Sequence, residues 1–251
     1  MVTNLSASYG SWPVDGCGGW APCAHVNEGG LVRGGQFPGR RCGDAYHPPR
    51  YNYLVNLGHL QFLASPEWAR MLESELLPWV EAAGNLGDDV LEIGPGPGLT
   101  TDLLRRRVSR VTAVEVDPTL GQALKERLAG TNVDVIVADA TQADLRGSGF
   151  SAAACFSVLH HMTTTEEQDR LFAEIHRVLR PGGIFVGQES LDLEMIRAGH
   201  ADDTFNPVDP ERLGERLSNV GFGPTEIDIL GYHYRFVSRK PNRCVTIYGG
   251  P

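Results

Sequence analysis

The feature that most constrains the fold is a glycine-rich turn, Gly94-Pro95-Gly96-Pro97-Gly98, which follows the short apolar run Val90-Leu91-Glu92-Ile93. Glycines let the backbone turn tightly and approach a ligand, and such a turn after the first strand of an α/β sheet is a place for a nucleotide-like ligand. The dinucleotide fingerprint is G-x-G-x-x-G. Here the spacing is G-x-G-x-G, and both intervening residues are prolines, which donate no amide hydrogen. The turn therefore favours a ligand without phosphate over NAD.

The residues after this turn alternate between short apolar runs and amphipathic stretches. Thr164 and Glu167 have the spacing of a capping box before one of these stretches. Short apolar runs separated by amphipathic helices are typical of a parallel sheet covered on both faces. Besides the strand before the turn, we expect strands at 111–116, 133–138, 151–157 and 184–188, with helices after the turn (99–107), from Pro118 and from the capping box.

The two ends of this region have a different pattern. Ser65 and Pro66 are suited to begin a helix, and Pro78 is expected to kink or end it. Residues 51–63 have the composition of a short helix. After a helix that begins at Pro210, two strands at 225–230 and 232–237 are too close together to enclose a crossover, so they should pair antiparallel. We expect a poorly ordered extension (1–45), a helical cover (46–84), the ligand-binding domain (85–241) and a tail (242–251).

The extension holds three of the five cysteines. Cys17, Cys23, His25 and Cys42 are an alternative zinc set, but the close C-x-x-C pair of a compact zinc site is missing. The odd, scattered cysteines also make a poor disulfide framework. We therefore interpret them as unpaired thiols and expect no metal site.

The net charge limits the kinds of partner that we expect. The formal net charge is −9, which argues against nucleic acid as the partner without excluding a local basic patch. Nothing in the sequence is typical of a membrane span or a signal peptide. We expect a cytoplasmic protein, as a monomer or a homodimer.

Two acidic residues follow the next two strands. Glu115 ends the second strand, about twenty residues beyond the turn, where a carboxylate can accept hydrogen bonds from ribose hydroxyls. The alternative for Glu115 is a carboxylate that serves the start of the next helix, near Asp117. Asp139 follows the third strand, where it could meet an adenine amino group or simply hold a turn.

From about Ser65 to Lys240 the chain resembles the class I S-adenosylmethionine-dependent methyltransferases, in the small-molecule branch that is similar to methyltransferase type 11. Five segments occur in the order and spacing of that family. They are Val90–Gly98, Val114–Asp117, Ala138–Ala140, Phe156–His161 and Arg177–Gly183.

This resemblance implies a Rossmann-like, doubly wound, seven-stranded α/β sheet, mostly parallel with an antiparallel last strand. It implies S-adenosyl-L-methionine as cofactor, S-adenosyl-L-homocysteine as product, and a methyl transfer by in-line displacement to an O, N or C atom of a small molecule. The implied cofactor residues are Glu92, Gly94 and Gly96 along the methionine part, Gly98 in the same turn, Glu115 at the ribose, Val116, Asp139 and Ala140 at the adenine, and Phe156 and Ser157 at the end of the fourth strand.

The segment after the fourth strand favours a small acceptor. Enzymes that methylate exocyclic amines of nucleic-acid bases usually have an Asn- or Asp-Pro-Pro-Tyr type of turn there, whereas this chain has Ser157-Val158-Leu159-His160-His161. His161 and His160 are the histidines nearest the expected transfer point, and Glu189 at the end of the fifth strand is a further candidate base. The alternative is that these histidines only cap or pack, as we expect for His233 and Tyr234.

The acceptor should be covered by residues 53–79 and 191–207. Aromatic residues there suit a flat apolar acceptor, or simply pack the cover: Tyr51, Tyr53, Phe62, Trp68 and Phe205. Three other functions stay open. They are a catalytically silent S-adenosylmethionine-binding regulator, an RNA methyltransferase, whose adenine-dimethylating members have a similar glycine motif, and a nicotinamide-dependent oxidoreductase, which the glycine spacing disfavours.

Overall fold

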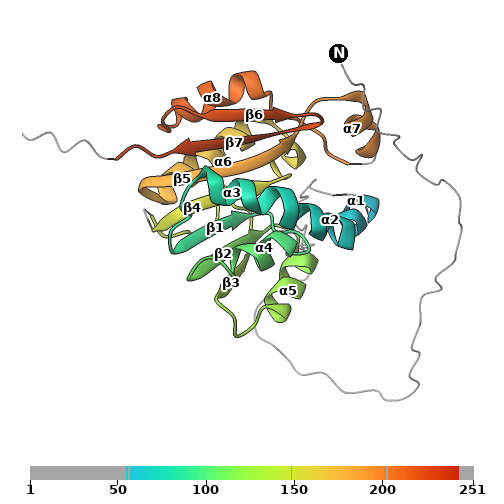
Figure 1. Ribbon diagram of the computed structural model, residues 1–251, viewed down its shortest axis with the longest axis horizontal. Coiled ribbons are helices and arrows are strands. Elements are labelled where there is room, and N and C mark those ends of the chain that lie inside the picture. The colour runs from blue at the N-terminus through green and yellow to red at the C-terminus, as the bar shows by residue number, and fades with distance from the viewer. Residues whose placement is uncertain (1–54, 56, 148, 202, 243–251) are drawn as a thin grey trace, which may run out of the picture. The chain divides into compact units, whose positions relative to one another are not determined.

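The computed structural model describes residues 55, 57–147, 149–201 and 203–242, and a seven-stranded sheet forms their centre (Figure 1). The strand order is β3-β2-β1-β4-β5-β7-β6. This confirms the expected Rossmann-like sheet. The strands are β1 (Asp89–Ile93), β2 (Arg110–Glu115), β3 (Val133–Val137), β4 (Phe150–Phe156), β5 (Leu179–Ser190), β6 (Glu226–Leu230) and β7 (His233–Arg239).

Strands β1 to β5 run parallel, and β7 lies antiparallel between β5 and β6. The expected pairing of the last two strands is confirmed. Leu230 pairs with His233, so the hairpin loop holds only Gly231 and Tyr232. Gly231 has a φ of +61°, which suits the first central position of a tight hairpin turn.

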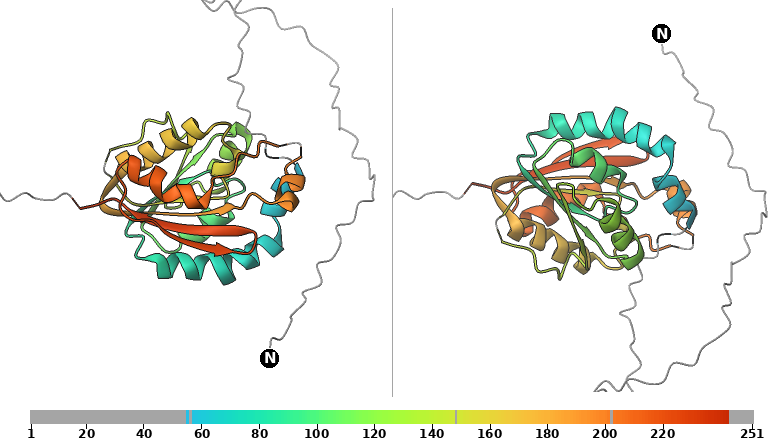
Figure 2. Two further views of the ribbon diagram at one scale, coloured as in Figure 1. Left: turned by 90° about the horizontal axis from the view of Figure 1, so that it is seen from above. Right: turned by 90° about the horizontal axis from the view of Figure 1, so that it is seen from below.

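Helices cover both faces of the sheet (Figure 2). Residues alternate along each strand, so that Val90 packs into one core and Leu91 into the other. One core joins the sheet to α3, α4 and α5, and the other joins it to α6 and α8. The α-helices are α1 (Leu57–Leu63), α2 (Pro66–Met71), α3 (Leu77–Ala83), α4 (Leu99–Leu104), α5 (Pro118–Arg127), α6 (Thr165–Val178), α7 (Glu194–Gly199) and α8 (Pro210–Asn219).

Of the two outcomes expected at Pro78, a kink or an end of the helix, the structure rules out the end. The helix does not end there, because a π-helical turn, η1 (Leu72–Leu76), joins α2 to α3 directly before the proline. A π turn widens the helix by one residue, which changes the carbonyl that each amide faces. The helix thus continues to Ala83 and places Leu72, Leu76 and Val80 in the core.

Strand β5 also begins earlier than expected. Leu179 already pairs with Phe150, and regular pairing resumes at Ile184 beside Ala152. The Pro181-Gly182-Gly183 segment is therefore an irregularity within the strand, although it follows the end of α6 as expected. Gly182 has a φ of +78°, which glycine adopts without strain.

Candidate functional site

A cavity lies at the carboxyl ends of β1, β2 and β4, where an open α/β sheet binds its ligand. The glycine turn, the end of β2, the turn after β3 and the end of β4 form its walls, and α1 and α2 cover it. It thus brings together most of the predicted cofactor residues. Those that line it are Gly94, Gly96, Glu115, Val116, Asp139, Ala140, Phe156 and Ser157, and further lining residues include Val55, Leu60, Leu63, Trp68, Thr100, Thr141, His161 and Met162.

The three glycines of the turn have distinct environments. Gly94, Gly96 and Gly98 have φ values of +63°, +54° and +85°, a region that L side chains rarely adopt. A Cβ at Gly94 would lie 2.6 Å from Cγ2 of Val158, whereas a Cβ at Gly96 would have open space around it. Gly98 does not line the cavity; it caps α4 and packs against Leu124. Gly96 thus leaves backbone space for a ligand, Gly94 lets the backbone line the cavity with Val158 packed against it, and Gly98 supplies the left-handed start of the helix.

Glu115 connects β2 to the glycine turn. Its Oε2 accepts a hydrogen bond from the amide of Gly96, and its Oε1 accepts one from the amide of Asp117, each at 2.9 Å. The side chain is buried, and burial raises the pKa of its carboxyl against the opposing effect of these hydrogen bonds. A carboxylate has about four acceptor positions, so Glu115 retains the capacity to accept two ribose hydroxyls.

Asp139 holds the turn after β3 and also lines the cavity. Its Oδ1 accepts hydrogen bonds from the amide and hydroxyl of Thr141, both at 2.8 Å, and its Oδ2 accepts one from Gln142 at 2.9 Å. Thr141 was not among the expected cofactor residues, and it lines the cavity too.

Glu92 lies behind the wall rather than on it. Alternation along β1 directs its side chain toward α4, where Oε1 accepts a hydrogen bond from the hydroxyl of Thr100. Burial raises the pKa of the Glu92 carboxyl to about 7. Thr100 lines the cavity and Glu92 does not, so Glu92 can influence the ligand through Thr100 without contacting it.

The end of β4 carries local strain. Ser157 has a φ of +58°, and it is the one non-glycine residue with a positive φ in the described part of the chain. Its amide is fixed by the carbonyl of Gln188 at 2.8 Å. Backbone strain of this kind clusters at ligand sites, because only a well-packed surrounding structure maintains it.

The three candidate catalytic residues occupy different positions. Glu189 accepts hydrogen bonds at 2.9 Å from the amides of Val158 and Leu159, and its Oε2 lies 2.5 Å from Nδ1 of His160. Both side chains are buried, and neither lines the cavity. Glu189 and His160 therefore hold the 3-10 turn η2 (Leu159–His161) in place. His161 is the candidate that lines the cavity.

The cover over the cavity agrees only partly with the prediction. Val55, Leu60, Leu63 and Trp68 line it, whereas no described residue of 191–207 does. Phe62 packs against Trp68 in a tilted arrangement, with ring centroids 5.2 Å apart, and is exposed. Phe205 instead packs on two histidines behind the cavity wall. Several sequence features lie outside the described residues, namely Tyr51, Tyr53, the extension, its cysteines and most of the tail.

A histidine from α1 approaches the same wall from outside. His59 lies 5.4 Å from His161 and 5.0 Å from His200, measured between ring centroids. Burial, reinforced by the neighbouring histidines, lowers the pKa of His59 to about 4. Its ring is therefore neutral at physiological pH.

Comparison with known proteins agrees with this geometry. A family described as "Methyltransferase domain" matches residues 91–187, which include the end of β1, the glycine turn and β2 to β4. The ribosomal RNA small subunit methyltransferase A of Deinococcus radiodurans is 38% identical over 101 residues, which are 39% of this chain and 35% of that protein. The chain thus spans about a third of the length of this curated relative.

Solved structures share the fold. A S-adenosylmethionine-dependent methyltransferase from Aquifex aeolicus has a TM-score of 0.60 at 16% identity, over 74% of this chain and 100% of that one. Phosphoethanolamine N-methyltransferase 2 of Haemonchus contortus, in complex with S-adenosyl-L-methionine, has a TM-score of 0.60 at 15% identity, over 75% of this chain and 61% of that one. Residues 91–187 thus match a methyltransferase domain family, and the chain shares the fold of solved S-adenosylmethionine-dependent methyltransferases.

Proposed function

We propose that the protein is an active methyltransferase that binds S-adenosyl-L-methionine in this cavity and methylates an O, N or C atom of a small molecule. The observation that carries the proposal is the apolar cover of the cavity, where Leu60, Leu63 and Trp68 line it together with the glycine turn and the end of β4. This surface fits a compact, largely apolar acceptor.

The residues present fit the cofactor. Gly96 leaves room for the methionine part, and the buried Glu115 carboxylate can accept the ribose hydroxyls. Val116 and Ala140 would pack on the adenine, with Asp139 at its edge, while Phe156 and Ser157 would close the pocket. When bound, S-adenosylmethionine supplies an electrophilic methyl carbon attached to a good leaving group. The chain then mainly has to hold the acceptor in line and exclude water.

The charge of the cavity supports a small acceptor over RNA. Among the described residues that line it there is no Lys or Arg, while Glu115, Asp117 and Asp139 contribute acidic groups. A nucleic-acid substrate gains much of its affinity from basic side chains that contact phosphates. The relative from Deinococcus radiodurans makes an RNA methyltransferase the second candidate.

Methyl transfer from labelled S-adenosylmethionine tests the proposal. The full chain is incubated with small-molecule extract fractions and, in parallel, with ribosomal RNA. We expect label in a small molecule and none in RNA. Label in RNA alone would support the second candidate, and cofactor binding without label in either would support a silent regulator. Within the described residues no helix has the length and apolar character to cross a membrane.

A further inference from the structure

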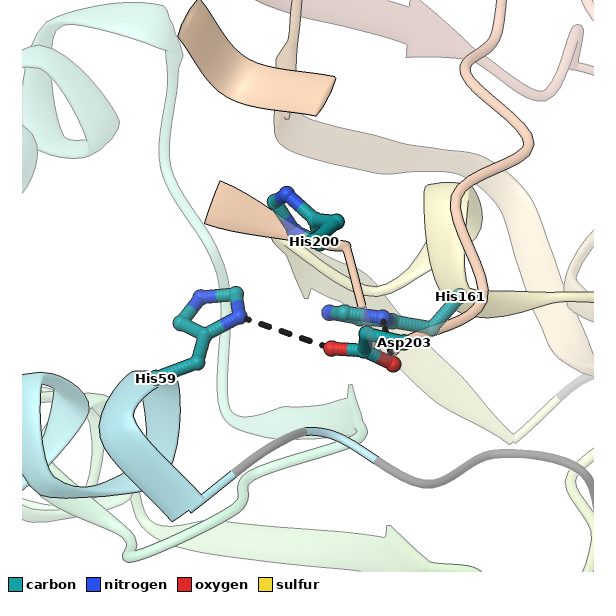
Figure 3. A group of neighbouring side chains, drawn as sticks. All are labelled: His59, His161, His200 and Asp203. Atoms are coloured by element: carbon teal, nitrogen blue, oxygen red, sulfur yellow. Dashed lines mark ion pairs between the residues drawn. The ribbon is translucent and has the colours of Figure 1, made fainter. Parts of the chain in front are cut away.

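Four side chains come together behind the cavity wall, and we call them the histidine cluster: His59, His161, His200 and Asp203. Figure 3 shows them converging from α1, from the turn after β4 and from the segment that follows α7. Each offers one possible metal-ligand atom, and these atoms lie within 4.8 Å of one another. Figures 1 and 2 agree that α1 and α7, which are far apart in the sequence, lie side by side.

Two of the imidazoles are oriented by backbone carbonyls. Nδ1 of His200 lies 2.7 Å from the carbonyl oxygen of Ile196, and Nδ1 of His161 lies 3.2 Å from that of Thr204. A carbonyl only accepts, so in each ring Nδ1 donates the proton and Nε2 carries the lone pair. Histidines that bind metals are typically held in this way, because a hydrogen bond from the outer nitrogen fixes both tautomer and orientation.

The lone pairs of these two rings are not used within the described part of the chain. Nε2 of His161 and Nε2 of His200 are both buried and accept no hydrogen bond there. The side chain of His161 is only 8% exposed, and that of Asp203 is fully buried. Leaving a buried polar atom unpaired costs about 1–3 kcal/mol. If the neutral rings only packed together, both Nε2 atoms would carry this free-energy cost. A metal ion that binds both atoms would remove it.

We propose that the histidine cluster binds one divalent transition-metal ion, with Zn²⁺ as the best fit. Three imidazoles and one carboxylate match the ligand types that zinc prefers. Zn–N and Zn–O bonds of about 2.0–2.2 Å place neighbouring ligands of a tetrahedral site roughly 3.3 Å apart. The ligand atoms therefore have to move together by about 1 Å, which side-chain rotation supplies. Asp203 Oδ2 already lies 3.9 Å from Nδ1 of His59.

The surroundings suit a metal centre. Phe205 packs against His200 at 4.6 Å and against His160 at 5.6 Å, measured between ring centroids, and so excludes water from that side. His160 stacks on His161 at 4.2 Å and is itself held by Glu189. The ligand rings are thus positioned by neighbours that do not belong to the cluster.

Such an ion would have a structural consequence for the cavity. His161 belongs to both the cluster and the cavity wall, and α1 contributes His59 to the cluster and Leu60 to the cover. The ion would therefore link the cover to the end of β4. Metal binding should raise the thermal stability of the chain without any cofactor present.

The test uses the full chain after chelator treatment. It is titrated with Zn²⁺ and, separately, with Co²⁺, whose visible spectrum reports the ligand types. We expect one equivalent of metal, a cobalt spectrum without thiolate charge-transfer bands, and a rise in the melting temperature. His200→Ala and Asp203→Ala should each weaken zinc binding by more than about 100-fold, since loss of an outer-shell partner alone costs about 10- to 100-fold.

Two controls make the result specific. His176→Ala removes a histidine outside the cluster, which stacks on Phe222, and should bind zinc like the unmodified chain. Replacement of Cys17, Cys23 and Cys42 by Ser should also leave binding unchanged. The proposal is overturned if the chain binds no metal, if the cysteine variant alone loses it, or if the cluster variants bind as tightly as the unmodified chain. None of these outcomes depends on methyl transfer.

Discussion

Oε2 of Glu115 accepts a hydrogen bond from the amide of Gly96 at 2.9 Å, which binds the end of β2 directly to the middle of the glycine turn. The two parts of the predicted cofactor site are therefore one structural unit. The carboxylate that should hold the ribose also fixes the backbone that should face the methionine part. A change at Glu115 is expected to affect both.

Glu115→Ala should weaken S-adenosylmethionine binding by about 10- to 100-fold, because a hydrogen bond to a charged group contributes about 1.5–3 kcal/mol. Glu115→Gln is the matched variant, since its amide oxygen can still accept one hydrogen bond, and it should fall between the two. Isothermal titration calorimetry on the full chain measures the three affinities. Equal affinity in all three would place the ribose elsewhere.

The fold could be predicted because its signals are local. Successive strand residues such as Val90 and Leu91 pack into the cores on opposite faces of the sheet. The short link at Gly231 permits only an antiparallel pairing of the two strands that it joins. The π turn before Pro78 could not be predicted, because it depends on how Leu72 and Leu76 pack on the sheet. The early start of β5 depends likewise on its pairing with β4.

The cofactor side of the site could also be predicted, since the ends of parallel strands meet at one edge. Two positions could not be predicted, because they depend on side-chain packing that the sequence does not show. Glu92 points away from the cavity, and Glu189 is buried beneath the turn after β4. Nothing in the sequence pointed to a functional role for His59 or His200. Each is a single histidine in a separate part of the chain, and only the fold shows that the two side chains lie close together.

Glu189→Ala should destabilise the fold by about 3–5 kcal/mol, because it leaves two buried amides and His160 without their shared acceptor. Glu189→Gln keeps one carbonyl oxygen as an acceptor, so it should lower the free energy of unfolding by less than Glu189→Ala. Urea unfolding at neutral pH measures both. If Glu189→Ala unfolds like the unmodified chain while methyl transfer stops, Glu189 is a catalytic base and its structural assignment is wrong.

Glu92 should make the stability of the protein depend on pH. Its pKa rises from 4.5 to about 7 on folding, so between these values the folded state binds a proton that the unfolded state has lost. The free energy of unfolding therefore falls as pH rises from about 4.5 to 7, by roughly 3 kcal/mol.

Glu92→Gln has no such proton and should lack this part of the pH dependence. Unfolding of both proteins at several pH values between 4.5 and 8 separates this contribution from those of other groups, which the two proteins share. The Gln variant should become the more stable of the two above pH 7. A constant difference across the range would contradict the raised pKa.

Gly94→Ala and Gly96→Ala form a matched pair. Both place a Cβ at a positive φ, which costs about 1–2 kcal/mol. Only the Cβ at position 94 also meets Val158, so Gly94→Ala should destabilise the fold more. Thermal unfolding ranks the two variants. Equal melting temperatures would show that the turn moves freely away from Val158.

A crystal structure of the full chain with S-adenosyl-L-homocysteine tests whether the cofactor occupies this cavity. We expect the ribose hydroxyls within hydrogen-bond distance of Glu115, the adenine beside Val116 and Ala140, and the sulfur facing the space bounded by His161 and Trp68. A ligand bound outside this cavity, or bound with its ribose away from Glu115, would contradict the proposal.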